Sequence, residues 1–484
     1  MKAYKIVYLL IIAMVFISTS CEDILEQTPK SDITQANFWS SPREAESGLV
    51  AVYSLYLNSA FFAFQLGEVR GDAVEMPTKW GYEMINPGTR DFNNNIIASV
   101  DGFSNWVAFY NIITRASEVL YFTERIEFVD LEDKDRILGE AYFLRASAYY
   151  ILAKNWGAVP LINEPFFAQG EDMYVERTPV DQIYEQIVND LTQAEELLPE
   201  TRSDLRVRAT KAAAQALFCD VLLTRGYTSF AQPGDFDNAI VKADAVLANP
   251  NYSLEAGVNY ADIFREGNSS ETIFEVAFDY NNSQTHNFSN FFLPRAYDRF
   301  RPYGGETFML PSHSLVDSFE PGDLRAATTF TVLAEEEEQY YDANVVGMTY
   351  GNKYLGTVTE MGVQRFSDDN IIIYRLPDVM LMKAEALIQT GNVPGAVTIV
   401  NQIRNRAGLA DEDASSQAEA LDLVLSERKK ELAFEGKRWY DLLRTGKVTE
   451  FRTEPEFIQD RFLLAVPQTE VDRNPKLLPQ NPTY

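Results

Sequence analysis

Aromatic side chains gather in two loop-like stretches of this sequence, and their chemistry suits the binding of sugars. The first stretch covers residues 61–102, which are rich in glycine, proline and asparagine, and the second lies within residues 251–370. Sugar rings carry an apolar face on which flat side chains stack, while a few polar groups fix the orientation. We therefore expect a sugar-binding platform from Trp80 and Tyr82 of the first stretch, Tyr297, Phe300 and Tyr303 of the second, and Trp106 near the start of the following helix. Arg70, Asp72 and Asn105 are the candidate hydrogen-bonding partners.

A short basic run lies inside the second stretch. Residues 294–303, PRAYDRFRPY, place Arg295, Arg299 and Arg301 among aromatic residues, in a chain whose formal net charge is −29. This local reversal of charge favours contact with an acidic or sulfated sugar, or with a peptide carboxylate. Arginines that face water without a ligand are the simpler interpretation of the same run.

The sequence offers no arrangement typical of a catalytic or metal centre. Its two histidines, His286 and His313, lie in loop-like segments, without the spacing of a nucleophile and base or of a metal-binding motif. No glycine-rich phosphate loop stands between a strand and a helix. With 71 acidic residues, pairs of carboxylates arise by chance, so they do not indicate a glycosidase. We expect a binding protein rather than an enzyme, and assign no cofactor and no metal ligands.

Charged residues repeat along residues 427–447, ERKKELAFEGKRWYDLLRTGK. On a helix, Glu435 and Arg438 lie three residues apart and can pair, and so can Asp441 and Arg444. We interpret this ladder as structural ion pairing. The net charge of −29 gives no general attraction to nucleic acid, which we exclude as a partner, but it does not decide between a sugar and a peptide ligand.

Helical periodicity dominates the chain outside the two loop-rich stretches. Residues 375–408 form a unit of about 34 residues, the length of a tetratricopeptide helix pair. Residues 271–280, ETIFEVAFDY, alternate as a strand does. We expect a mainly α fold of tetratricopeptide-like helix pairs, with a loop-rich insertion that holds a few short strands. The other predicted helices cover residues 43–57, 103–126, 133–155, 179–198, 209–224 and 236–247.

The amino terminus reads as a lipoprotein signal peptide. Lys2 and Lys5 precede an apolar run at residues 6–17 that is too short to span a bilayer comfortably, and small polar residues lead to Cys21. We predict cleavage before Cys21 and lipid attachment to it, since several acyl chains anchor a protein almost permanently. A plain secretory signal with an incidental cysteine is the alternative. We expect no other membrane-crossing helix.

Several separated segments resemble the SusD/RagB family of outer-membrane, nutrient-binding lipoproteins, and they occur in that family's order. The segments are CEDILEQTP from Cys21, EAYFLRASAYYILAKNWGAVPLI at 140–162, the unit at 375–408, the block at 427–447, and NPKLLPQNPTY from Asn474.

This resemblance implies a SusD-like α–α superhelix on the cell surface, anchored by lipid at Cys21 in the outer membrane. It implies capture of oligosaccharide or polysaccharide and delivery to a SusC-type TonB-dependent transporter, without bond cleavage. Capture of peptides, as in the RagB branch, remains an alternative, and so, from other classes, do a secreted glycosidase and a tetratricopeptide adaptor.

The expected division of the chain follows from these patterns. It comprises a signal peptide at 1–20, a lipid-anchored tether at 21–42, an N-terminal helical region at 43–250, a loop-rich insertion with the ligand face at 251–370, and a C-terminal signature region at 371–484.

Overall fold

The computed structural model places most of the chain after its first 37 residues. It describes residues 38–77, 87–100, 102–165, 173–201, 205–265, 267, 269–293, 305, 307–332, 349–359 and 365–484. The predicted signal peptide, Cys21 and the whole basic run at 294–303 lie outside these residues.

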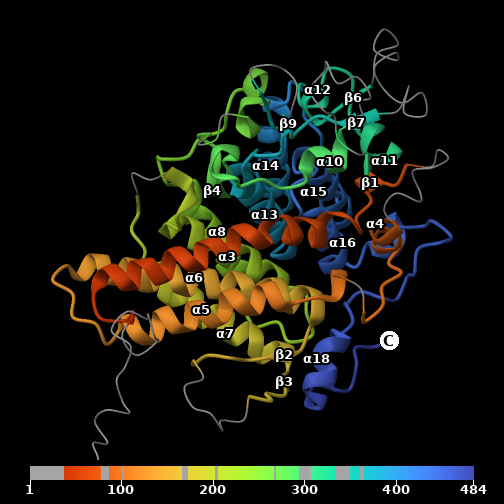
Figure 1. The fold of residues 1–484 in the computed structure, drawn as a ribbon. Helices are drawn as coiled ribbons and strands as arrows, with labels where there is room; N and C mark the ends of the chain where they lie inside the picture. The colour runs from red at the N-terminus through yellow and green to blue at the C-terminus, as the bar shows by residue number, and fades with distance from the viewer. Residues whose placement is uncertain are drawn as a thin grey trace, which may run out of the picture.

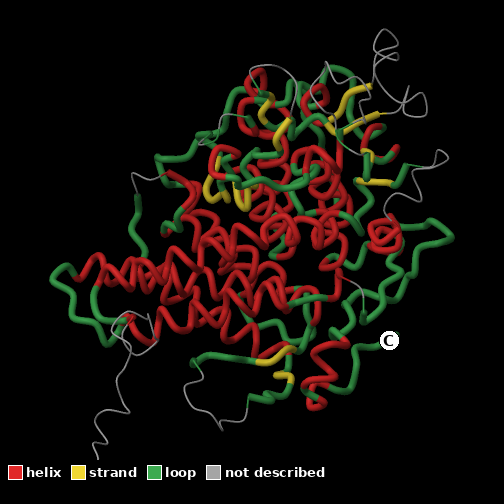
Figure 2. Tube along the Cα trace, in the orientation of Figure 1, coloured by secondary structure: helices red, strands yellow, loops and turns green. Residues whose placement is uncertain are grey.

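Long helices build the lower and central parts of the molecule, and strands are confined to its upper part and to one pair near the carboxyl end (Figure 2). Helix α6 packs between α5 and α7, α8 packs between α7 and α9, and α3 packs against α5 and α6 (Figure 1). The helices of this region are α3 (Pro42–Glu68), α5 (Val107–Thr123), α6 (Leu131–Trp156), α7 (Val180–Leu197), α8 (Lys211–Gly226) and α9 (Asp235–Leu247).

The helical layer continues across the insertion. Helix α9 packs on α13 (Leu376–Gln389), which in turn packs on α14 (Val393–Arg406) and α15 (Gln417–Glu431). The predicted interrupted series of helix pairs is thereby confirmed, because helices on either side of the insertion share one layer. The pair α13–α14 turns at Gly391, whose φ of 86° suits glycine, and Asn392 caps α14 by accepting from the Gly395 N–H at 3.0 Å.

Two segments differ from the prediction by more than a few residues. Helix α3 runs to Glu68 rather than residue 57, so part of the predicted first loop is helical. The block at 427–447 is two helices, α15 and α16 (Arg438–Arg444), with residues of positive φ between them at Phe434 and Gly436. Because of this break, Glu435 pairs with Arg375 at 2.8 Å, and the expected pairing of Glu435 with Arg438 is wrong.

Helix α3 also corrects the expectation that no segment beyond the leader could cross a membrane. By length and composition it is apolar enough to do so. In this structure, however, α3 belongs to the core, where Ala45, Leu49 and Val52 are fully buried against the other helices.

Short antiparallel strand pairs organise the insertion, as expected, and the predicted strand at 271–280 appears as β4. The pairs are β1 (Val74–Glu75) with β5 (Leu310–Pro311), β4 (Thr272–Val276) with β10 (Ile371–Arg375), β6 (Phe330–Val332) with β7 (Thr349–Gly351), β8 (Thr357–Val358) with β9 (Arg365–Phe366), and, outside the insertion, β2 (Val159–Pro160) with β3 (Arg177–Thr178). The short helices are α4 (Pro87–Asn93), α10 (Phe288–Phe292), α11 (His313–Val316), α12 (Ala326–Thr329), α17 (Val448–Phe451) and α18 (Gln468–Arg473).

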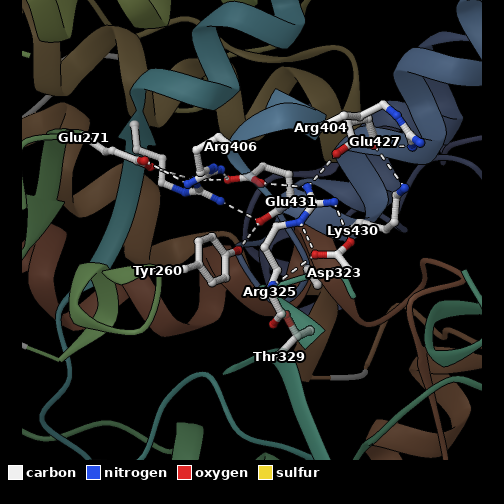
Figure 3. A network of polar contacts seen from close by, with 12 residues as sticks. Tyr260, Glu271, Asp323, Arg325, Thr329, Arg404, Arg406, Glu427, Lys430 and Glu431 are labelled. Carbon is white, nitrogen blue, oxygen red and sulfur yellow. Dashed lines mark hydrogen bonds and ion pairs between the residues drawn. The ribbon is translucent and has the colours of Figure 1, made fainter. Parts of the chain in front are cut away.

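A buried ion network joins the insertion to the helical layer (Figure 3). Glu431 at the end of α15 accepts from Arg325 of the insertion at 2.9 Å and from Arg375 at 2.5 Å. Arg325 also pairs with Asp323 at 2.7 Å and with Glu427 at 2.6 Å, and all of these side chains are fully buried. Since each charge has an opposite neighbour, the network confirms that the ladder at 427–447 is structural.

Candidate functional site

The two loop-rich stretches meet at the short β1–β5 ladder. Val74 faces Pro311 and Glu75 faces Leu310. The Ser312 hydroxyl donates to the Asp72 carbonyl oxygen at 2.6 Å, next to this ladder. The structure therefore brings together the described ends of the stretches in which we predicted ligand recognition.

Asp72 fixes this junction to the helical layer. Its buried carboxylate pairs with Lys429 at 2.9 Å and with Arg438 at 2.5 Å. Burial alone would raise the pKa of Asp72, but the two cations outweigh it and lower the pKa to about 2. Asp72 is thus an ionised anchor, and the prediction that it hydrogen-bonds a ligand is not supported, because both of its oxygens are occupied inside the protein.

Three phenylalanine rings shape a pocket of about 370 Å³ between α3, α4 and the 3-10 turn at Gly102–Ser104 that precedes α5. The Phe92 and Phe103 rings stack with their centroids 3.9 Å apart and their planes 3° apart. Phe62 packs near Phe103 at 6.3 Å, and both of these rings are half-buried. The pocket is lined by Phe62, Gln65, Gly88, Asp91, Phe92, Ile96, Ile97, Gly102 and Phe103.

This lining combines an apolar body with few polar groups. Gln65 and Asp91 are half-buried and bring an amide and a carboxylate to the pocket. Arg90 pairs with Asp91 at 2.9 Å, which offsets the charge of that carboxylate. Aromatic faces with a small number of orienting polar groups are the usual composition of a small-molecule site.

Arg70 and Trp106 lie beneath the surface instead of forming the predicted platform. The Arg70 guanidinium is fully buried, 4.2 Å from the Trp439 ring centroid, and donates to Asn155 Oδ1 at 3.1 Å. Trp106 is 3% exposed and packs edge-on against Trp156 at 6.1 Å. Neither side chain is accessible for direct contact with a sugar, because residues of other helices, such as Trp439 and Trp156, pack against them.

Asn105 is exposed at the start of α5, close in sequence to Phe103. Its side-chain oxygen accepts a hydrogen bond from the Val107 N–H at 3.0 Å. Its side-chain NH₂ group is a separate donor that does not take part in this bond. The remaining predicted contacts, Trp80, Tyr82, Tyr297, Phe300 and Tyr303, lie outside the described residues.

Two family profiles match this sequence. One, described as "SusD family", covers residues 337–484, and the other, described as "Starch-binding associating with outer membrane", covers residues 24–223. The chain belongs to the SusD family. The resemblance that the sequence segments suggested is therefore confirmed.

Known relatives of this SusD-like protein match it over nearly their whole length. SusD-like protein P38 of Formosa agariphila is 28% identical over 535 residues, with 100% of both chains covered. A SusD-like protein of Bacteroides ovatus is 24% identical over 496 residues, covering 94% of this chain and 84% of its own.

Solved structures share the fold. A laminarin-binding SusD-like protein is 26% identical, with a TM-score of 0.76 over 92% of this chain and 100% of its own. NanU of B. fragilis is 23% identical, with a TM-score of 0.79 over 94% of this chain and 99% of its own. The mainly helical architecture predicted from sequence is thus confirmed.

Sequence reasoning missed the phenylalanines of the pocket. It favoured the tryptophan and tyrosine residues of the first stretch, because these pair a flat face with a polar group. A weak signal was present, since Phe92 directly precedes the polar run at 93–95 of this SusD-like protein and Phe103 follows eight residues after that run. Only packing shows that the two rings stack and that Phe62 of α3 joins them.

The described residues of this SusD-like protein contain no group of three or more His, Cys, Asp or Glu side chains that could hold a metal ion. Burial lowers the pKa of His286 to about 4, and its Nε2 lies 2.7 Å from the Asp369 carbonyl oxygen. His313 is instead exposed and pairs with Glu75 at 2.8 Å beside the β1–β5 ladder.

Proposed function

We propose that this SusD-like protein is a cell-surface lipoprotein that binds oligosaccharides or polysaccharide through the aromatic pocket and delivers them to a SusC-type TonB-dependent outer-membrane transporter. The observation that carries the proposal is the pocket itself, with half-buried phenylalanine faces and a few polar groups. A structural relative that binds laminarin supports a glycan as the ligand class.

Binding in this pocket rests on contact between C–H groups and aromatic faces. The half-buried rings of Phe62 and Phe103 offer flat apolar surface, and the stacked Phe92 ring holds Phe103 from behind. Gln65 and Asp91 would orient the hydroxyl groups of the sugar. No bond is cleaved in this proposal, since the pocket needs only to capture and release its ligand.

Anchoring and delivery belong to the same proposal. Lipid attachment at Cys21 would hold the protein in the outer membrane, facing outward, where soluble glycans are available. Accessibility of the protein to an added protease on intact cells, and co-purification of a TonB-dependent transporter, test these two parts separately from glycan binding.

The glycan test compares variants across a ligand panel. We expect affinity electrophoresis and calorimetry to detect polysaccharide binding by the wild type, and we expect Phe62→Ala and Phe103→Ala each to weaken it about tenfold or more. Phe230→Ala is a matched control, because Phe230 is a half-buried ring that packs 5.3 Å from Tyr184, in the helical layer and outside the pocket lining.

The rival functions give different results in the same panel. Binding of peptides but of no glycan would favour the peptide-capturing alternative. Appearance of new reducing ends in a glycan incubated with the protein would show a glycosidase. Unchanged affinity in both pocket variants would remove the pocket from the proposal.

A further inference from the structure

Arg70 is a buried guanidinium without a carboxylate partner among the described residues. It donates to Asn155 Oδ1 at 3.1 Å and to the Phe462 carbonyl oxygen at 3.4 Å, and its Nε has no hydrogen-bond partner. Burial lowers the pKa of Arg70 to about 10, so the group remains charged at neutral pH.

Among the described residues, the other buried arginines have carboxylate partners. Arg325, labelled in Figure 3, contacts Glu427 and Glu431, and Arg375 contacts Glu431 and Glu435. Arg428 pairs with Asp378 at 2.9 Å, and Arg444 pairs with Asp441 at 2.7 Å. In a chain with a net charge of −29, a fully buried arginine without a carboxylate partner is unusual, because an unpaired buried charge is energetically costly. This cost indicates that the charge of Arg70 serves a function.

The uncompensated charge lies directly behind the aromatic pocket. The Arg70 guanidinium carbon is 5.1 Å from the centroid of Phe92, and Phe92 stacks on Phe103. A second guanidinium, that of Arg461, donates to the carbonyl oxygen of Ile97, a pocket-lining residue, at 3.1 Å. Asp91 is the acid in this lining, and Arg90 offsets it.

We propose that the pocket binds a sugar unit bearing an anionic group, either a carboxylate or a sulfate ester. This inference rests on the proposed glycan-binding function and specifies its ligand class. A positive charge held behind an apolar ring stack is screened less than a surface charge, so it attracts an anion seated on the outer face of the stack. Added salt still weakens part of this attraction, because the bound anion itself faces solvent. A neutral sugar gains nothing from the charge and keeps only its stacking contacts.

In this arrangement Arg70 is a positioning and specificity-determining residue. It does not touch the ligand, and it acts through its charge and through the Phe92 ring that it supports. A purely structural role would affect neutral and anionic ligands alike, whereas an electrostatic role affects the anionic ones alone. That difference separates the two roles in one experiment.

The experiment uses one glucan in three forms: the neutral parent, its C6-oxidised carboxylate form and its sulfate ester. The proteins are the full-length wild type, Arg70→Met, Arg70→Lys and the control Arg265→Met, which removes an exposed arginine of the insertion. Methionine keeps apolar contact with the Trp439 and Phe92 rings while it removes the charge. Dissociation constants are measured by calorimetry at low and high salt.

We expect the wild type to bind at least one anionic form on the order of tenfold more tightly than the neutral parent, with a preference that shrinks as salt is added. Arg70→Met should lose this preference and keep its affinity for the neutral glucan, while Arg70→Lys and Arg265→Met should retain the preference. The oxidised and sulfated forms distinguish the two sources of charge.

Equal binding of all three glucans by the wild type, or an undiminished preference in Arg70→Met, would overturn the inference and leave the proposed function intact. Absence of binding to every glycan would instead count against the proposed function, and this inference would fall with it. If Arg70→Met does not fold, Arg70→Gln takes its place, because glutamine also removes the charge, and an undiminished preference in that variant would overturn the inference.

Discussion

The Lys429 ammonium donates to the Asp72 carboxylate at 2.9 Å, deep inside the protein and between residues far apart in the sequence. Arg438 contacts the same carboxylate at 2.5 Å. One acid of the first loop thus meets two cations from α15 and α16, and it holds the β1–β5 junction against the helical layer.

Replacement of this acid should be strongly destabilising. In Asp72→Asn, Arg438 and Lys429 remain buried without their counter-charge, so we expect a loss of about 3–5 kcal/mol in the free energy of unfolding. Urea titration followed by circular dichroism measures it. Glu450→Gln is the control, because Glu450 is 56% exposed in its pair with Lys447 and should contribute less than about 1 kcal/mol. Similar losses in both variants would contradict the prediction.

Glu68 should make stability depend on pH. Hydrogen bonds from the backbone N–H groups of Phe434 and Gly436 lower its pKa, but burial outweighs them and raises the pKa to about 8. The folded state therefore favours the neutral carboxyl. The contribution of Glu68 to the free energy of unfolding is fully present below the unfolded-state pKa of about 4.3, and it is lost as pH rises toward about 8.

We expect Glu68→Gln to flatten the decline in unfolding free energy from about pH 5 to about pH 8, by up to about 1.4 kcal/mol per pH unit. Urea titrations at several pH values measure the slope, and Glu127→Gln, at an exposed position, is the control. A slope equal to that of the wild type in Glu68→Gln would show that Glu68 is charged in the folded protein.

The stacked rings of the pocket should be energetically coupled. Phe92 and Phe103 lie 3.9 Å apart, so a double-mutant cycle with Phe92→Leu and Phe103→Leu should give a coupling of about 0.5–1.5 kcal/mol in unfolding free energy. Additive effects would mean that the stack does not persist in solution, and the pocket would lose its rear support.

Two glycines should respond very differently to a methyl group. A Cβ at Gly67 would lie 1.9 Å from the Gly436 carbonyl oxygen, so Gly67→Ala must push α3 away from the α15–α16 turn. At Gly391 nothing lies within 4 Å, and only its φ of +86° opposes a side chain. We expect losses of about 3 kcal/mol and about 1 kcal/mol respectively, measured by thermal unfolding.

Much of the fold was predictable because the signals are local. The 3.6-residue period located α5 to α9, and the Gly391-Asn392 turn with Pro394 located the α13–α14 pair. Helix ends were less predictable. Helix α3 continues beyond the predicted end because its later residues, such as Phe64 and Leu66, are buried against other elements, and that burial is not encoded locally.

The candidate site was predictable only as a region. The sequence pointed to the first loop, and the pocket lies there, but Arg70, Asp72 and Trp106 proved to be buried. The type of a polar or aromatic residue does not reveal its exposure, because exposure depends on partners such as Arg438, Trp439 and Trp156, which lie far away in the sequence.

By itself, the sequence determined the helical repeats, the loop-rich insertion and the membership of the SusD family, since periodicity and motif order are properties of neighbouring residues. The tertiary structure alone decided which aromatic rings form the pocket, which acid anchors the β1–β5 junction and which arginine lies behind the pocket without a carboxylate partner. These features depend on contacts between residues that lie far apart in the sequence. Whether a charge or a ring stabilises the fold or is available to a ligand depends on its burial and its partners in those contacts.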